Sequence, residues 1–404
     1  MLGSHTCNDT GGTAAAASTD RTTRGRHRGE KRSSEMSRHV GASVIQNGVM
    51  NTIPSLPPPG ANPPPSLPPA YWVPAPVAQL PPAKPLPFHR MARTYSAYRW
   101  FKPLLVGLIA LGLYIGMMII ASIGFFVVIL SDPALEALLD SAMSSPEDLD
   151  MSEPSIFVFA MISIILMLPA ILWATRMMNV QKVGSLSSVT GRIRWGWLGW
   201  CATVALGVLG LSFGLSFLVD SIAGYEVAPS GGAPNLWLMV GLTLLLVPFQ
   251  AAAEEYVFRG YLMQLIGGWL RHPAFAILLP IPFFVLGHDY DIYGQLDVGM
   301  FALAAGWLTW RTGGLEAAIA LHVVNNVLLF LMGAVGLIDV NDSAGSLGSL
   351  IFSTVTTGVF VLLVLWLANR RHIQRFSTPR PPAPVLTAPG SWVQPGGWTP
   401  PSAH

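Results

Sequence analysis

Hydrophobic residues between positions 104 and 368 fall into long runs that short polar stretches separate. Most of these runs approach the roughly 20 residues that a helix needs to cross about 30 Å of hydrocarbon. The runs cover residues 104–130, 156–174, 195–219, 236–253, 274–286, 298–310, 315–338 and 350–368. The pattern therefore predicts an all-α fold, a polytopic transmembrane helical bundle of about eight spans.

The fifth and sixth runs are shorter than the others, with 13 residues each. A buried or re-entrant pair of helices is the alternative to two full spans, because such segments are tolerated where protein covers them. The end of the fourth run is also open. Its helix can continue through "EEYVFRGYLMQL", beyond residue 253.

The composition changes on both sides of the apolar region. Residues 1–95 are first rich in Ser and Arg and then rich in Pro, and residues 376–404 are again rich in Pro. Such segments bury too little apolar surface to offset chain entropy. We expect a disordered tail over 1–95, a transmembrane domain over 96–375 and a second disordered tail over 376–404. Solvated linkers are the simplest interpretation of the tails, and a proline-recognising partner is the alternative.

Charged residues are few, and the basic ones are confined to alternate loops. Only 11% of the residues are charged, against about 25% in ordinary soluble proteins, and a net charge of +2 gives no reason to expect nucleic acid. Lys and Arg occupy alternate loops, at Arg90, Arg93, Arg99, Lys102, Arg176, Lys182, Arg192, Arg194, Arg259, Arg271, Arg311, Arg370, Arg371 and Arg375. Because cytoplasmic loops carry the excess of Lys and Arg, we expect a multi-pass cell-membrane protein with both termini cytoplasmic.

Two adjacent carboxylates and an arginine follow directly after the fourth run. Residues four apart share a face of a helix, so Arg259 can neutralise and orient Glu255. Glu254 is rotated about 100° away and has a different environment. It is thus free to act as a general acid or base. The alternative is an ion-pair cluster that only fixes the helix at the membrane boundary.

Further polar residues lie inside two other runs. His322 and Asn326 are four apart and project from one face of the seventh run. His288 stands at the end of the fifth run, four residues after Phe284. Each group alone can be a hydrogen-bonding link between helices. Three polar clusters in one bundle favour a shared site instead, whereas Glu316 begins its segment and needs no role beyond a helix N-terminus.

The motifs EExxxR at 254–259, FxxxH at 284–288 and HxxxN at 322–326 occur in this order on three hydrophobic segments. The trio resembles the CAAX-protease and bacteriocin-processing family of intramembrane endopeptidases, relatives of the CAAX prenyl endopeptidase. The resemblance covers about 236–330, the motif core. One departure is "HDYD", which places Asp289 and Asp291 after the histidine where apolar residues are expected.

The resemblance implies a protease whose site is enclosed by helices within the membrane. Glu254 would be the general base, and His288 would help to hold the attacking water. His322 and Asn326 would stabilise the oxyanion of the tetrahedral intermediate, as positioned donors do in a dry site. The substrate would be a peptide or a lipid-modified protein, reached from the membrane lipid or from solvent.

Glu255 and Arg259 would set the geometry of this site, and the preferred mechanism requires no cofactor. A zinc ion held by His288, His322 and Glu254 is the alternative. The chain lacks the HExxH zinc motif, and Asn326 is a poor zinc ligand.

Two functions of other classes remain beside the protease. One is a non-catalytic scaffold or peptide-toxin immunity protein of the same fold. The other is a transporter with a proton relay, which predicts inverted repeats that the sequence does not display.

The shared site sets a condition on the fold. Glu254 falls near the cytoplasmic end of its run, whereas His288 falls near the far end of a short one. For the two to meet, the fourth helix must extend past Arg259. Alternatively, the fifth run must bend, which Pro280 and Pro282 favour.

Overall fold

The computed structural model describes residues 71–72, 84–131, 133, 136–137, 150–224, 233, 235–378 and 392–393. The chain divides into two units, one of residues 72–393 and one of residues 1–71 with 394–404. The described part of the first unit is built almost entirely of helices. Two strands of two residues each, β1 (Tyr71–Trp72) and β2 (Trp392–Val393), pair with each other. The predicted all-α fold class is confirmed.

Six helical stretches among the described residues are long and apolar enough to cross a membrane. They contain α1 (Lys102–Ser131), α3 (Pro154–Ile165) with α4 (Met167–Met178), α5 (Trp195–Ile222), α6 (Leu236–Glu255), α11 (Glu316–Ala334) and α12 (Leu347–Arg370). Of the eight expected runs, six thus qualify as candidate spans among the described residues. The two runs that do not qualify are the short ones, the fifth and the sixth.

The fifth run forms two short helices, α8 (Pro273–Leu278) and α9 (Ile281–Val285). The break between them falls at Leu279 and Pro280. Proline lacks an amide hydrogen and its ring clashes with the preceding turn, so the chain bends here as expected. The sixth run lies within α10 (Ile292–Thr312), which is 21 residues long but has Gln295 and Asp297 in its first two turns.

The fourth run continues well beyond its apolar part. After α6 the chain passes through a π-helix, η4 (Tyr256–Leu262), and then α7 (Met263–Trp269). Leu236–Trp269 is therefore one continuous helical stretch of 34 residues. Both conditions for the meeting of Glu254 and His288, the extended fourth helix and the bent fifth run, are met.

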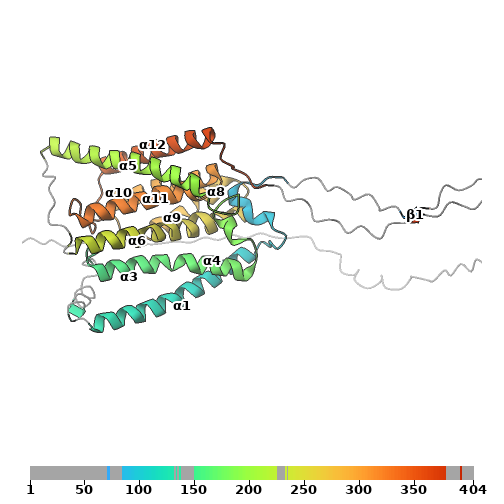
Figure 1. Ribbon diagram of the computed structural model, residues 1–404, viewed down its shortest axis with the longest axis horizontal. Coiled ribbons are helices and arrows are strands. Elements are labelled where there is room, and N and C mark those ends of the chain that lie inside the picture. The colour runs from blue at the N-terminus through green and yellow to red at the C-terminus, as the bar shows by residue number, and fades with distance from the viewer. Residues whose placement is uncertain are drawn as a thin grey trace, which may run out of the picture. The chain divides into compact units, whose positions relative to one another are not determined.

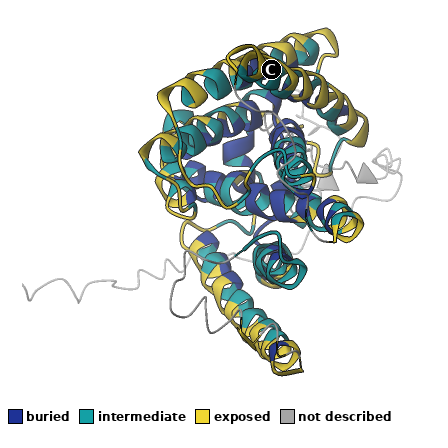
Figure 2. Cartoon of the chain, turned by 90° about the vertical axis from the view of Figure 1, so that its left-hand side faces the viewer, coloured by how far each residue is buried: buried dark blue, intermediate teal, exposed yellow. Residues whose placement is uncertain are grey.

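Helix α11 lies among the other helices and is packed against α5, α6 and α10 (Figure 1). Small residues on its first turns, Ala317, Ala318 and Ala320, are buried and let neighbouring helices approach closely. The outer faces of α1, α5 and α12 are instead exposed, whereas the buried residues gather between the helices (Figure 2). Exposed apolar side chains such as Ile120, at 71%, suit contact with lipid tails. The chain is a membrane protein.

The first predicted tail ends before residue 95. A 3₁₀ helix, η1 (Phe88–Thr94), packs against α7, and Phe88 is completely buried. The second tail begins after residue 376, because Ser377 donates its backbone N–H to the Leu86 carbonyl at 2.9 Å. The apolar residues of "FHRMA" reach the core, which the proline-rich composition around them concealed. The rest of both predicted tails, apart from β1 and β2, lies outside the described residues.

Candidate active site

Glu255 and Arg259 form the innermost part of the polar centre. The Arg259 guanidinium donates to Oε1 of Glu255 at 2.7 Å, and both residues are buried. The predicted pair is therefore present. The same guanidinium stacks on the Phe284 ring, with 4.3 Å from its carbon to the ring centroid. This cation–π contact connects the first motif to the second and gives the motif phenylalanine a physical role.

His322 lies between the two neighbouring carboxylates. Its Nδ1 is 2.9 Å from Oε1 of Glu255, and its Nε2 is 3.3 Å from Oε2 of Glu254. Helices α6 and α11 supply these three side chains, and α6 packs against α11 along this face. The two adjacent glutamates, which point in different directions on their helix, thus meet the two edges of one imidazole ring.

The contact between His322 and Glu254 has a consequence for protons. Nδ1 of His322 takes the role of donor, because Glu255 Oε1 already accepts from Arg259 and has the character of a carboxylate. Nε2 then faces Glu254 Oε2, which has no hydrogen bond of good geometry. Two lone pairs at 3.3 Å repel each other. The contact is favourable only when one proton lies between the imidazole and the Glu254 carboxyl group.

His288 is positioned by the end of α9. Its Nδ1 lies 2.8 Å from the Phe284 carbonyl oxygen, one turn earlier. A neutral ring that donates through Nδ1 keeps Nε2 as a free acceptor. The ring also stacks near Tyr290, with 6.2 Å between centroids.

Asn326 is held through its amide by two neighbours. Its Nδ2 donates to Oε1 of Gln250 at 3.2 Å, and its Oδ1 accepts from Asn325 at 3.1 Å. Gln250 is 5% exposed and lies one turn before Glu254 on α6. Sequence reasoning missed Gln250 as a member of the centre. The signal was its four-residue spacing from Glu254, the same spacing that linked Glu255 to Arg259.

A cavity of about 510 Å³ brings most of these groups to one space. Glu254, His288, His322 and Asn326 line it, together with Gln250. Glu255 and Arg259 do not line the cavity. Four of the six residues expected at the site therefore face one cavity. Of the other two, Glu255 contacts His322 and Arg259 contacts Glu255.

The two aspartates of the "HDYD" departure have separate places. Asp291 is the N-cap of α10, where its side chain accepts from the backbone N–H of Gly294 at 2.8 Å. An Asp at this position satisfies an otherwise unpaired amide of the first turn. Asp289 is exposed and does not line the cavity. Neither residue alters the arrangement of the motifs.

Comparison with known proteins agrees with this geometry. Residues 234–328 match the family described as type II CAAX prenyl endopeptidase Rce1-like. The chain is also 24% identical over 259 residues to the uncharacterized protein YyaK of Bacillus subtilis (strain 168). That alignment covers 62% of this chain and 82% of the relative. No solved structure matches.

The Rce1-like segment contains all three motifs, and the family resemblance is confirmed over it. Members of the family are proteases, so the chain is classed with the hydrolases at this coarse level.

The described residues of the Rce1-like segment do not fit a resident metal ion. No three His, Cys, Asp or Glu side chains in the described part of the chain cluster closely enough to hold one. Both ring nitrogens of His322 are directed at carboxylates, and Nδ1 of His288 is directed at a backbone carbonyl. The zinc set of His288, His322 and Glu254 is therefore not assembled here.

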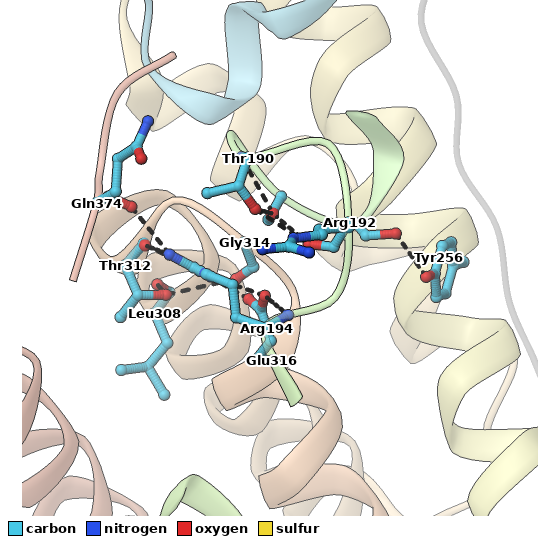
Figure 3. Close-up of polar contacts among 11 residues, drawn as sticks. Thr190, Arg192, Arg194, Tyr256, Leu308, Thr312, Gly314, Glu316 and Gln374 are labelled. Atoms are coloured by element: carbon cyan, nitrogen blue, oxygen red, sulfur yellow. Dashed lines mark hydrogen bonds and ion pairs between the residues drawn. The ribbon is translucent and has the colours of Figure 1, made fainter. Parts of the chain in front are cut away.

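A third buried glutamate, Glu316, lies at the start of α11, and its contacts go beyond those expected of a helix N-terminus. Arg194 contacts Glu316 through Nε at 2.8 Å and through the terminal nitrogen at 2.7 Å (Figure 3). The same guanidinium donates to the backbone carbonyls of Thr312 and Gln374. This cluster ties the loop before α5 to α11 and to the segment after α12. Glu316 is thus a structural anchor.

Proposed function

We propose that this chain is an intramembrane endopeptidase that hydrolyses a peptide bond with a water molecule activated by Glu254. One observation carries the proposal. Glu254 is only 8% exposed, lines the cavity beside His288 and Asn326, and places its Oε2 3.3 Å from Nε2 of His322. A buried carboxyl group next to an imidazole and a cavity suits a general base that acts on a water molecule.

In the proposed reaction Glu254 takes a proton from water while the oxygen of that water attacks the carbonyl carbon. The carbonyl oxygen becomes an oxyanion in the tetrahedral intermediate. The carboxyl group then gives its proton to the leaving nitrogen as the C–N bond breaks. The products are a carboxylic acid and an amine, and Glu254 returns to its ionised form.

His322 and Asn326 supply donors on the α11 side of the cavity. A protonated His322, held at Nδ1 by Glu255, presents its Nε2–H beside Glu254 and can donate to the oxyanion. Asn326 uses one amide hydrogen on Gln250 and keeps the other for a ligand. His288 faces them with Nε2 as an acceptor for the attacking water.

Glu255 and Arg259 keep His322 in this position. The Glu255 carboxylate lies 2.9 Å from Nδ1 of His322 and orients the ring, and Arg259 contacts the same carboxylate oxygen at 2.7 Å. This is the work of positioning residues, since neither side chain lines the cavity. Preorganised charges of this kind need no rearrangement during the reaction.

The placement of the protein in the cell membrane with both termini cytoplasmic is part of the proposal. It follows from the loop charges, because every Lys- or Arg-bearing loop then lies inside. Single cysteines at position 192 and at position 339, in a background without Cys7 and Cys201, test it. A membrane-impermeant thiol reagent added to intact cells should label position 339 and not position 192.

The endopeptidase proposal is tested with purified full-length protein in lipid nanodiscs. A mixture of peptides, with and without a prenylated cysteine, is incubated with the parent or with Glu254→Gln, and new amino termini are identified by mass spectrometry. We expect cleavage by the parent alone. Equal product from both proteins contradicts the role of Glu254. No cleavage of any peptide by the parent favours the non-catalytic scaffold or immunity function.

The metal question has its own measurement. A proton-transfer role for Glu254 predicts less than stoichiometric zinc by elemental analysis and unchanged cleavage in the presence of a chelator. Stoichiometric zinc in the parent, lost in both His288→Ala and His322→Ala, would instead support the metalloprotease alternative.

A further inference from the structure

The cavity that contains the proposed catalytic residues is strongly acidic. Besides Glu254, the aspartates Asp297, Asp339 and Asp342 line it, and no Lys or Arg does. None of the three aspartates takes part in an ion pair among the described residues. Their negative charge is therefore left for whatever enters the cavity.

Neutral donors hold these three carboxylates in place. Asp297 accepts a hydrogen bond from the Ser353 hydroxyl. Asp339 and Asp342 each accept one from the backbone N–H two residues later, at 2.9 and 2.8 Å. Such bonds orient a carboxylate without cancelling its charge. A cavity with walls of low dielectric strengthens the resulting negative potential.

Residues from 287–294 and 338–345, at one end of the bundle, line the cavity, and we take this end as its mouth. The backbone N–H of Asp291 donates to the Ser343 carbonyl at 3.1 Å, which joins the two segments. The chain contains no Lys or Arg between residues 272 and 310 or between 312 and 369. A compensating cation from the neighbouring loops is thus absent from the sequence itself.

Asp297 lies close to the proposed catalytic centre. It is one turn before Phe301 on α10, and the Phe301 ring centroid is 5.1 Å from that of His322. Partial burial raises the pKa of the Tyr290 hydroxyl, and the carboxylates of Asp297 and Glu254 raise it further. Both carboxylates therefore act on one hydroxyl. Asp297 is thus linked to His322 through one helical turn and one ring contact.

Independent observations indicate that the cavity takes a ligand. Glu254 lines it together with His288, His322 and Asn326, so several groups that can donate or accept hydrogen bonds converge on one space. Apolar side chains, including Met161, Leu209 and Phe213, form another wall of the same cavity. Its volume of about 510 Å³ lies within the usual range for ligand sites, roughly 300–1,000 Å³.

We propose that the substrate is a cationic, partly apolar peptide segment that enters through the acidic mouth. This inference rests on the endopeptidase function proposed above. A Lys or Arg side chain of this segment pairs with Asp297. An extended peptide rises about 3.3 Å per residue, so this basic residue lies within a few positions of the scissile bond. Asp339 and Asp342 attract a further positive charge at the mouth and steer the approach of the segment.

The experiment uses full-length protein in nanodiscs of phosphatidylcholine, whose neutral surface does not attract basic peptides. The probes are three fluorescent peptides of one apolar sequence that carry Lys, Gln or Glu at the same flanking positions. Dissociation constants come from fluorescence anisotropy, and cleavage rates are measured in parallel. We expect the Lys peptide to bind about tenfold more tightly than the Gln peptide, and the Glu peptide to bind most weakly.

Two matched variants locate the effect. Asp297→Asn keeps an oxygen for Ser353 but removes the charge, and it should reduce the preference for Lys over Gln to about twofold or less. Asp289→Asn removes the same charge from an exposed position outside the cavity, and it should leave the preference unchanged.

The results test the cationic substrate and the proposed hydrolysis separately. Equal binding of the three peptides overturns the cationic substrate, and so does an equal loss in Asp297→Asn and Asp289→Asn. A Lys preference that depends on Asp297 supports it. If that preference is present but no peptide is cleaved, the proposed hydrolysis fails while the assignment of the ligand class stands.

Discussion

Two buried glutamate–arginine centres lie on α11 and its neighbours, and they differ in how completely their oxygens are used. At the start of α11, Glu316 accepts the backbone N–H of Arg194 at 2.9 Å, its Nε at 2.8 Å and a terminal nitrogen at 2.7 Å. Both oxygens of this carboxylate have donors. Such a fully satisfied cluster fixes the positions of chain segments.

The second centre includes His322, six residues after Glu316 on α11, and some of its carboxylate oxygens have no hydrogen bond. Oε2 of Glu254 and Oε2 of Glu255 are both buried without a hydrogen-bond donor, although Arg259 and His322 contact the same pair of residues. A cavity adjoins Glu254, whereas Glu316 does not line it. Burial and an arginine partner are common to both centres. Unsatisfied acceptors beside an open space distinguish the centre that we propose to be catalytic.

The largest expected difference between the centres is in activity. Glu254→Gln should lower the rate of peptide cleavage by about 10²–10⁴-fold, because it removes a general base but preserves the shape of the side chain. Its thermal unfolding should match that of the parent. If Glu254→Gln keeps more than about a tenth of the parent's cleavage rate, Glu254 is not the general base.

Changes at the centre formed by Arg194 and Glu316 should lower the stability of the protein. Arg194→Ala leaves Glu316 as a buried charge without its partner, which typically costs about 3–5 kcal/mol. We expect a lower yield in membranes and a lower midpoint of thermal unfolding, with unchanged cleavage per folded molecule. Arg192→Ala is the matched control, because Arg192 is exposed two residues earlier. Lost activity at normal stability in Arg194→Ala would mean that the two centres are coupled.

Arg259→Ala should combine both effects. It removes a partner of Glu255 and the cation–π contact with Phe284, so stability and cleavage should both fall. Arg259→Lys keeps the charge but not the planar stacking group, and it should recover part of the stability. A variant with normal stability and no activity would show that Arg259 contacts the substrate or the transition state directly.

His322 and Asn326 test whether the second centre acts as a unit. If both donate to one oxyanion, His322→Ala with Asn326→Ala should lose little more activity than the worse single variant. Initial rates of the parent, the two single variants and the double variant give the coupling. Additive losses would assign the two residues to separate steps.

The smallest expected effect concerns Gln250. Gln250→Ala breaks one hydrogen bond to Asn326, which is worth about 0.5–1.5 kcal/mol. We expect a loss of cleavage of up to about tenfold, and no further loss when Asn326→Ala is already present. Independent losses in the double variant would separate Gln250 from the Asn326 side of the site.

Local geometry made part of the site readable from the sequence. Glu255 with Arg259, and His322 with Asn326, are spaced by four residues, and a helix puts such residues on one face whatever surrounds it. The same spacing pointed to Gln250, which was overlooked because a neutral amide before a carboxylate gave no chemical signal. The length of the apolar runs likewise predicted the all-α class, because each run needs only its own residues to form a helix.

Only the tertiary structure decided which faces meet. His322 contacts Glu255 across 67 positions, Asn326 contacts Gln250 across 76, and Arg194 contacts Glu316 across 122. These contacts depend on how α5, α6 and α11 pack together. Local sequence patterns do not specify that packing. The sequence by itself determined the helices and the side chains that each one presents. Packing decided that one imidazole would stand between two carboxylates, and that one glutamate would be fully hydrogen-bonded while another faced a cavity.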